Sequence, residues 1–128
     1  MNREPMRSPL RQALGLGSAK NGVEHWWLQR VTAIALAPLT VWFAASLIAH
    51  AGNDYATFVV WLRRPIATFP MGLLLIALFY HTALGLQVVI EDYVHSGMKI
   101  PALLCVRFGC LALAVAGIVA TLRIAFGA

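Results

Sequence analysis

The stretch from Pro65 to Ile90 runs for 26 residues without an aspartate, glutamate, lysine or arginine. About 20 apolar residues are enough for a helix to cross about 30 Å of hydrocarbon, so this stretch predicts a membrane-spanning helix. His81 stands near its middle, where an ionisable side chain carries a free-energy cost and points to a partner or a function. We therefore expect an integral membrane protein with a candidate functional residue inside one span.

Two further stretches complete the membrane prediction. Val31 to Ala51 has no charged residue, and Phe108 to Leu122 becomes a full span when residues 100–106 are added and Arg107 snorkels toward the interface. Sixty per cent of the residues are hydrophobic, 12% are charged and the mean hydropathy is +0.75, which is unlike a soluble domain. We predict an all-α integral membrane protein whose single domain, residues 1–128, has transmembrane helices at about 29–50, 68–93 and 100–124.

The basic residues predict the orientation of these helices. Seven fall on one side of the predicted membrane and three on the other: Arg3, Arg7, Arg11, Lys20, Arg30, Lys99 and Arg107 against Arg63, Arg64 and Arg123. The positive-inside rule then places the N-terminus, with residues 1–25 as a tail, in the cytoplasm and the C-terminus on the outer, periplasmic side. The net charge of +5 is explained by this topology and requires no nucleic-acid partner.

Local signals predict how the chain is shaped between and within the spans. Pro38 should bend the first helix, because proline removes one helical hydrogen bond. The connection on the outer side is expected to hold a short interfacial helix capped near Asn53, with Trp61 at the membrane interface.

His81 belongs to a pattern that suits a flat ligand. Gly85 lies one helical turn away and Asp92 about three turns away, so all three project from nearly the same face. A neutral imidazole beside a surface cleared by glycine is what axial ligation of haem requires. Two structural alternatives stay open: the histidine hydrogen-bonds across helices, or Gly85 only permits close helix packing. Cys105 and Cys110 have no metal-site or c-type haem spacing.

Asp92 and Tyr93 end the same helix in an unfavourable place for carboxylates. The negative end of the helix dipole disfavours Glu91 and Asp92 there, so these residues do not stabilise the helix. A phenol beside a carboxylate suits hydrogen bonding to a quinone carbonyl and proton supply, although Tyr93 equally fits an interfacial belt. Arg30 enters the membrane on the same side and is a candidate to pair with Asp92 or with an anionic ligand.

Together, these residues resemble a known family. The segments Asn21–Val23, Arg30–Ala33 and His81–His95, the last with the pattern His-x3-Gly-x6-Asp-Tyr, are similar to the hydrophobic membrane anchor subunits of bacterial succinate dehydrogenase, respiratory complex II. The resemblance covers about residues 15 to 126. It implies a multi-pass protein of the bacterial inner membrane that forms a haem-binding helical bundle with a cytochrome b subunit.

The resemblance also implies roles for particular residues. His81 matches the axial ligand of haem b, with a second histidine supplied by the cytochrome b subunit. Asp92 and Tyr93 match residues bordering the ubiquinone site, and Arg30 matches an arginine near the haem propionates and the quinone pocket. Four residues receive no role from the family: Glu24, which replaces a histidine of some members, and His25, His95 and Arg107.

The implied activity belongs to a complex. This chain has neither a nucleotide-binding domain for flavin nor clustered cysteines for iron–sulfur clusters, so a flavoprotein subunit and an iron–sulfur subunit must supply succinate oxidation and the electron relay. We expect a membrane anchor of succinate:ubiquinone oxidoreductase with no catalysis of its own. Two alternatives from other classes are a proton or ion pathway through His81, Asp92 and His95, and a non-redox scaffold of another membrane complex.

Overall fold

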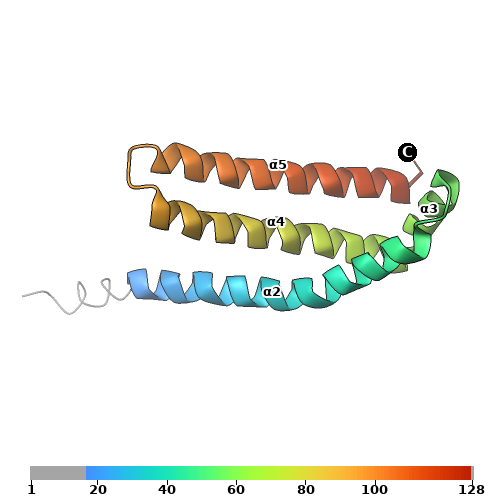
Figure 1. Ribbon diagram of the computed structural model, residues 1–128, viewed down its shortest axis with the longest axis horizontal. Coiled ribbons are helices and arrows are strands. Elements are labelled where there is room, and N and C mark those ends of the chain that lie inside the picture. Colours follow the sequence, from blue (N-terminus) through green and yellow to red (C-terminus); the bar gives the residue numbers. More distant parts are fainter. Residues whose placement is uncertain (1–16, 128) are drawn as a thin grey trace, which may run out of the picture.

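The structure, a computed structural model, describes residues 17–127. This part of the chain is helical throughout, with α2 at Gly17–His50, α3 at Tyr55–Leu62, α4 at Pro65–Tyr93 and α5 at Lys99–Ala125. The three long helices run antiparallel side by side, and the short α3 crosses one end (Figure 1). All three are long and apolar enough to cross a membrane. The predicted all-α chain with three apolar spans is confirmed, whereas its orientation stays a prediction.

The helices are longer than the spans expected from hydropathy. α2 begins at Gly17 rather than near Gln29, so residues 17–25 of the expected tail are helical, while residues 1–16 lie outside the described residues. α4 begins at Pro65 rather than at Thr68, because proline suits the first helical position, where no backbone N–H is needed. A hydropathy boundary marks where apolar residues end, whereas a helix continues as long as its backbone hydrogen bonds form.

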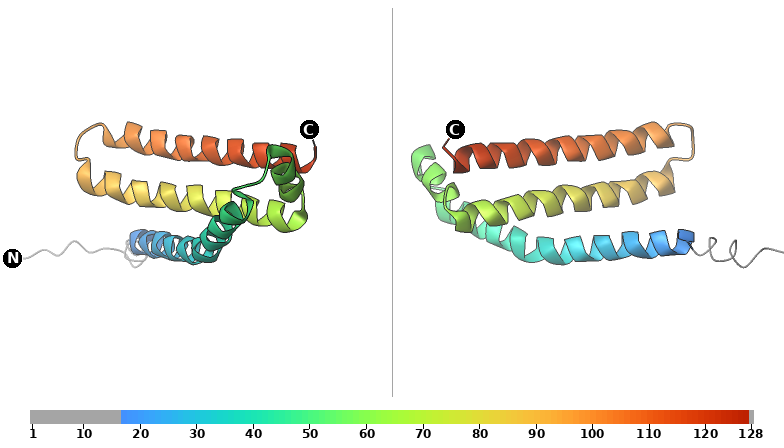
Figure 2. Two further views of the ribbon diagram at one scale, coloured as in Figure 1. Left: turned by 45° about the vertical axis from the view of Figure 1, so that its right-hand side comes forward. Right: turned by 180° about the vertical axis from the view of Figure 1, so that it is seen from behind.

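α2 contains the expected bend. Pro38 lies inside this 34-residue helix and removes one of its backbone hydrogen bonds. Figure 2 shows that α2 changes direction in its second half, where the chain turns toward α3. The bend brings the end of α2 to the end of the molecule where α4 begins.

α4 is the central element of the fold. It packs against α2 on one side and α5 on the other, while α2 and α5 have no substantial contact. Ala67, Leu74, Ala77 and Leu84 of α4 are among the few buried hydrophobic residues. α5 approaches closely at Gly117, where an added Cβ would lie 3.2 Å from the Leu75 side chain. The three helices therefore form an open row, which encloses no interior of its own.

α3 is the short helix predicted for this connection, and its cap lies near Asn53 as expected. The Asp54 carboxylate, rather than Asn53, accepts a hydrogen bond from the backbone N–H of Thr57 at 3.1 Å. The hydrogen bond from the Thr57 side chain lowers the pKa of the Asp54 carboxyl below its ordinary value of 3.8, and the hydrogen bond from the Thr57 backbone lowers it further by a smaller amount. Because this pKa is lowered on folding, the cap is fully formed above that value and is lost as the pH falls through the folded pKa.

Aromatic contacts and one hydrogen bond fasten α3 to its neighbours. The Trp61 ring lies 4.5 Å from the His50 ring and 6.0 Å from the Trp42 ring, measured between centroids. Arg63 donates from Nε to the Ile124 carbonyl at 3.1 Å, which joins the end of α3 to the end of α5. These contacts hold together the end of the molecule opposite the α4–α5 turn (Figure 1).

Most large apolar side chains face outward. Ile34, Ile48, Ile66, Phe69 and Ile100 are each at least 69% exposed, and similar residues cover all three long helices. Soluble proteins do not expose large apolar side chains along the whole length of their helices in this way. In a membrane it is covered by lipid or by the helices of other proteins.

Candidate functional site

His81 faces α2 in the middle of the helix pair. Its Nδ1 atom lies 3.0 Å from Thr32 Oγ1, and the side chain is half-buried. One turn further along α4, a Cβ added at Gly85 would lie 4.0 Å from Gln29 Nε2. These two neighbouring pairs show that α2 and α4 pack antiparallel with His81 level with Thr32. This distance is an ordinary van der Waals contact, so Gln29 lies beside Gly85 without requiring a glycine there.

The hydrogen bonds of Thr32 bear on which nitrogen of His81 carries a proton. The Thr32 hydroxyl oxygen lies 2.8 Å from the Leu28 carbonyl oxygen and 3.0 Å from the Gln29 carbonyl oxygen, and it has one proton to donate. When this proton goes to a carbonyl of α2, Thr32 Oγ1 accepts from His81 Nδ1, because carbonyl oxygens only accept. In that arrangement Nε2 of His81 keeps a lone pair.

A pocket of about 310 Å³ opens beside His81 between α2 and α4. Its other lining residues come from successive turns of α2: Trp26, Gln29, Arg30 and Ala33. The Arg30 guanidinium lies 5.3 Å from the centre of a Trp26 ring, a cation–π contact that directs this charge toward the start of α2. The structure thus brings together two residues that the sequence singled out separately, His81 and Arg30.

Asp92 and Tyr93 lie at a distance from this pocket. Both are exposed at the end of α4, Tyr93 by 79%. Asp92 is 11 residues beyond His81, which is about 16 Å along the helix. The register of the two helices places Asp92 level with Gly22, about 12 Å along the axis from Arg30. In the described part of the chain Arg30 therefore contacts Trp26 instead of pairing with Asp92.

Among the residues without an expected role, His25 stands out by its burial. Its Nε2 atom is buried and has no hydrogen-bond partner among the described residues. His25, Gln29 and Thr32 follow each other at helical spacing, so they share the face of α2 that packs against α4. Glu24 and His95 are exposed. Burying a ring nitrogen without a hydrogen bond costs free energy of folding. This face of α2 is thus more polar than packing alone requires.

Sequence reasoning missed Thr32 and Gln29 as parts of the site. Both could have been found by their spacing, because polar residues at positions i, i+4 and i+7 of a membrane helix mark one face that turns away from lipid. Which partner this face meets depended on the packing of α2 against α4. The alternative that His81 hydrogen-bonds across helices is fulfilled at Nδ1, while Nε2 has no hydrogen-bond partner among residues 17–127.

Comparison with known proteins identifies the family. The family model described as succinate dehydrogenase/fumarate reductase transmembrane subunit matches residues 4–122. The chain belongs to this family. The succinate dehydrogenase hydrophobic membrane anchor subunit of Paracoccus denitrificans is 31% identical over 122 residues, which is 94% of each chain.

Members of the succinate dehydrogenase/fumarate reductase transmembrane subunit family from Rickettsia are similar as well. The anchor subunit of Rickettsia bellii is 42% identical over 89 residues, covering 69% of this chain and 70% of the relative. That of Rickettsia conorii is 35% identical over 111 residues, covering 85% of this chain and 88% of the relative. No solved structure gives a significant match. These relatives confirm the resemblance to bacterial anchor subunits and a multi-pass membrane protein.

Proposed function

We propose that this chain, as a membrane anchor of succinate:ubiquinone oxidoreductase in the bacterial inner membrane, supplies His81 as one axial ligand of haem b and forms part of the ubiquinone site. The observation that carries the proposal is the hydrogen bond between Thr32 and His81, with its consequence for the ring nitrogens. An imidazole binds iron through an unprotonated nitrogen, and its other N–H is normally held by an acceptor. In this proposal Thr32 is that acceptor, and Nε2 is the nitrogen that binds iron.

The surroundings of His81 fit one edge of a haem. Gly85 and Ala33 leave space beside the imidazole, and Trp26 adds a flat apolar wall. Arg30 lines the same pocket and has the geometry to bind the carboxylate of a propionate. Haem supplies one-electron redox chemistry to such a site when it is bound. The pocket is open and small, so another subunit must provide the remaining walls and the second axial ligand.

Tyr93 and Asp92 are the residues of this chain that we propose for the ubiquinone site. The Tyr93 hydroxyl is exposed at the end of α4, level with the first turns of α2, and can donate a hydrogen bond to a quinone carbonyl. The neighbouring Asp92 carboxylate is also exposed and can relay protons from water as the quinone is reduced. Only one wall of a site is present in this chain. The iron–sulfur and cytochrome b subunits are the proposed sources of the others, with the flavoprotein subunit docked beyond them.

The geometry favours this proposal over a proton pathway. His81 and Asp92 are separated by about 16 Å along α4, and the residues between them on that face are apolar or glycine. A relay of protons needs polar groups or water within hydrogen-bond distance of one another. No second function is proposed, because a relay lacks this chain of polar groups and a plain scaffold gives no role to the pocket beside His81.

A visible absorption spectrum of the purified complex, oxidised and then reduced with dithionite, tests the haem assignment. The wild type is expected to show the low-spin b-type spectrum of iron with two nitrogen ligands. His81→Ala should lose or alter it, whereas His50→Ala, at the far end of α2 in the aromatic cluster around Trp61, should leave it unchanged. An unaltered low-spin spectrum in His81→Ala would eliminate His81 as the ligand.

A further inference from the structure

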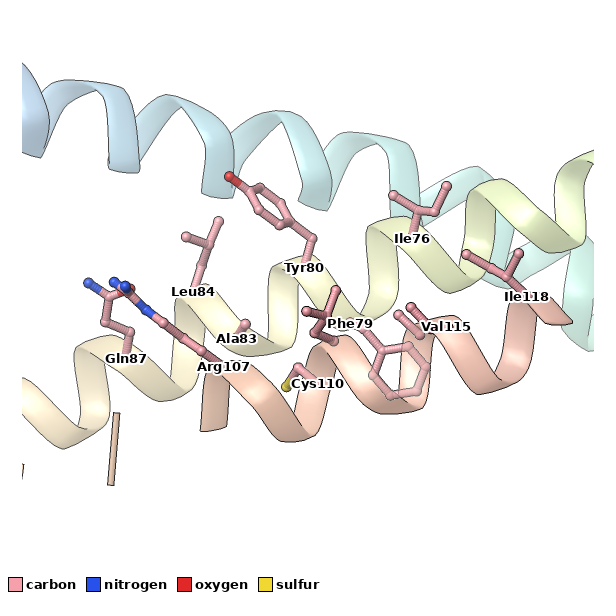
Figure 3. A pocket seen from close by; sticks show the side chains of 12 residues that line it. Ile76, Phe79, Tyr80, Ala83, Leu84, Gln87, Arg107, Cys110, Val115 and Ile118 are labelled. Atoms are coloured by element: carbon pink, nitrogen blue, oxygen red, sulfur yellow. The ribbon is translucent and has the colours of Figure 1, made fainter. Parts of the chain in front are cut away.

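A second cavity lies on the opposite side of α4 from the pocket beside His81. This groove between α4 and α5 has a volume of about 440 Å³ (Figure 3). Its walls are mostly aliphatic and aromatic, with Ile76 and Ile118 at one end. At the other end the close-up shows Gln87 and Arg107 next to each other. The groove is therefore apolar along its length and carries a positive charge at one end.

A hydrogen-bonded chain holds the charged end in place. Arg107 Nη2 donates to Gln87 Oε1 at 3.3 Å, and Gln87 Nε2 donates to Glu91 Oε1 at 3.1 Å. The Glu91 carboxylate thus accepts from the Gln87 amide and fixes its orientation. The Arg107 guanidinium bonds to the oxygen of that amide, which carries no charge. Among the described residues no carboxylate is bonded to Arg107. The guanidinium is positioned, and most of its five N–H groups still need acceptors.

Arg107 lies near one boundary of the hydrocarbon layer. α4 has 29 residues and is about 43 Å long, so it extends about 6 Å beyond each side of a 30 Å hydrocarbon layer if it is centred. Gln87 lies six residues, or about 9 Å, from the end of α4, close to the boundary of that layer. Side chains lean toward the N-terminus of their helix, which for Arg107 is the same end. Lipid phosphates lie just outside this boundary, within reach of a side chain that leans toward it.

The dimensions of the groove select its occupant. On both helices the lining residues span 11 residues, from Gln87 to Ile76 and from Arg107 to Ile118, or about 16 Å at helical rise. Half the thickness of the hydrocarbon layer is about 15 Å. One extended acyl chain reaches over this distance, and the apolar walls suit it along its whole length.

We propose that the groove between α4 and α5 binds one anionic phospholipid, with its phosphate on Arg107 and one acyl chain along the apolar walls toward Ile118. The site is separate from the pocket of His81, which faces α2, and does not depend on haem or quinone. Arg107 thereby gains the acceptors that the described residues do not offer. The lipid fills the seam between the two helices over half of the membrane.

The phospholipid that stays bound to the complex purified in mild detergent tests this proposal. Native mass spectrometry should find a tightly held anionic phospholipid in the wild type. Arg107→Gln should bind phosphatidylglycerol about 10- to 100-fold more weakly, because a charge-assisted contact is lost. Arg107→Lys should keep the lipid in part, and Ala114→Phe should lose it by filling the groove while Arg107 is intact. Arg123→Gln, which removes a charge at the other end of α5, is the matched control and should keep it.

A titration of the wild-type complex with phospholipid tests the proposal even if a variant does not assemble. After removal of lipid, phosphatidylglycerol should raise the melting temperature of the complex more than phosphatidylcholine with the same acyl chains, and this difference should vanish in Arg107→Gln. Equal binding of both lipids by the wild type, or equal retention of anionic lipid by Arg107→Gln and Arg123→Gln, would overturn the proposal. So would a wild type that loses all anionic lipid without a change in stability, since Arg107 would then pair with a carboxylate of another subunit.

Discussion

Thr32 Oγ1 and His81 Nδ1 lie 3.0 Å apart across the contact between α2 and α4, although 49 residues separate them in the sequence. The hydroxyl oxygen also lies within hydrogen-bond distance of two carbonyls of its own helix, and donating its proton there leaves it as an acceptor for the imidazole. A single hydroxyl thus contacts the ring at Nδ1 and leaves Nε2 for another partner. This makes Thr32 a positioning residue for whatever binds Nε2.

Thr32→Val should change the properties of a haem bound to His81 without removing it. Valine keeps the shape of threonine and deletes the acceptor of the Nδ1 proton, so the imidazole becomes a poorer electron donor to iron. A hydrogen bond of about 0.5–1.5 kcal/mol corresponds to a rise in the haem reduction potential of about 20–60 mV. Redox titration of the purified complex measures this change in the haem reduction potential. Thr32→Ser should restore the wild-type potential.

A second threonine on α2 provides the control for this measurement. The exposed Thr40 hydroxyl also donates to its own helix, at 2.6 Å to the Leu36 carbonyl, but it has no partner on α4. Thr40→Val should therefore leave the potential unchanged. If Thr32→Val and Thr40→Val give the same potential as the wild type, Thr32 has no influence on the haem.

Tyr93→Phe should separate quinone chemistry from anchoring at the membrane interface. The ring and its apolar area remain, while the hydroxyl that would donate to a quinone carbonyl is lost. If this hydroxyl stabilises charge that develops on the reduced quinone, the loss costs about 2–4 kcal/mol, or roughly 30- to 1000-fold in the rate of ubiquinone reduction. Steady-state rates with ubiquinone measure this, while transfer from succinate to an artificial acceptor at the soluble subunits should be nearly unchanged.

Another exposed tyrosine serves as the control. Tyr55, at the start of α3, is 78% exposed, almost the same as Tyr93, and lies at the other end of the molecule. Tyr55→Phe should reduce ubiquinone at the wild-type rate. Equal rates for Tyr93→Phe and Tyr55→Phe would make Tyr93 an interfacial anchor and leave the quinone site unassigned on this chain.

Cysteine labelling should show the predicted orientation. Asn53, between α2 and α3, and Gly97, between α4 and α5, are exposed at opposite ends of the three long helices. In a background with Cys105 and Cys110 replaced by serine, a membrane-impermeant maleimide applied to intact inner-membrane spheroplasts should label Asn53→Cys. Gly97→Cys should react only after the membrane is permeabilised. The reverse pattern would invert the orientation, and labelling of both from outside would contradict three spans.

Gly117→Val should weaken the contact between α5 and α4. The site of a Cβ at Gly117 is already 3.2 Å from Leu75, so a branched side chain must displace packed atoms at a cost of about 1–3 kcal/mol. Gly109, on the same helix, has nothing within 4 Å of its Cβ site, so Gly109→Val controls for the change in helix propensity. Thermal unfolding of the purified complex should show a lower melting temperature for Gly117→Val only. Equal melting temperatures would mean that α5 shifts to accommodate valine.

Much of the fold was predictable because the relevant information is local. Uncharged stretches of sufficient length, such as Pro65 to Ile90, predict membrane helices without knowledge of any other residue. The shared face of His81, Gly85 and Asp92 likewise follows from helical periodicity alone. The exact ends of α2 and α4 did not follow, since hydropathy reports where a segment is apolar and a helix ends where its hydrogen bonds end.

The site itself was decided by the packing of one helix on another. The sequence by itself determined that His81 lies in a membrane span and that Arg30 stands near the start of another. Only the tertiary structure decided that Thr32 meets His81, that Arg30 shares its pocket and that Asp92 lies too far along α4 to reach Arg30. It also placed Gln87 beside Arg107 at the end of an apolar groove. Such pairings depend on the register between helices, which is determined by close contacts such as Gln29 against Gly85 and Leu75 against Gly117, far apart in the chain.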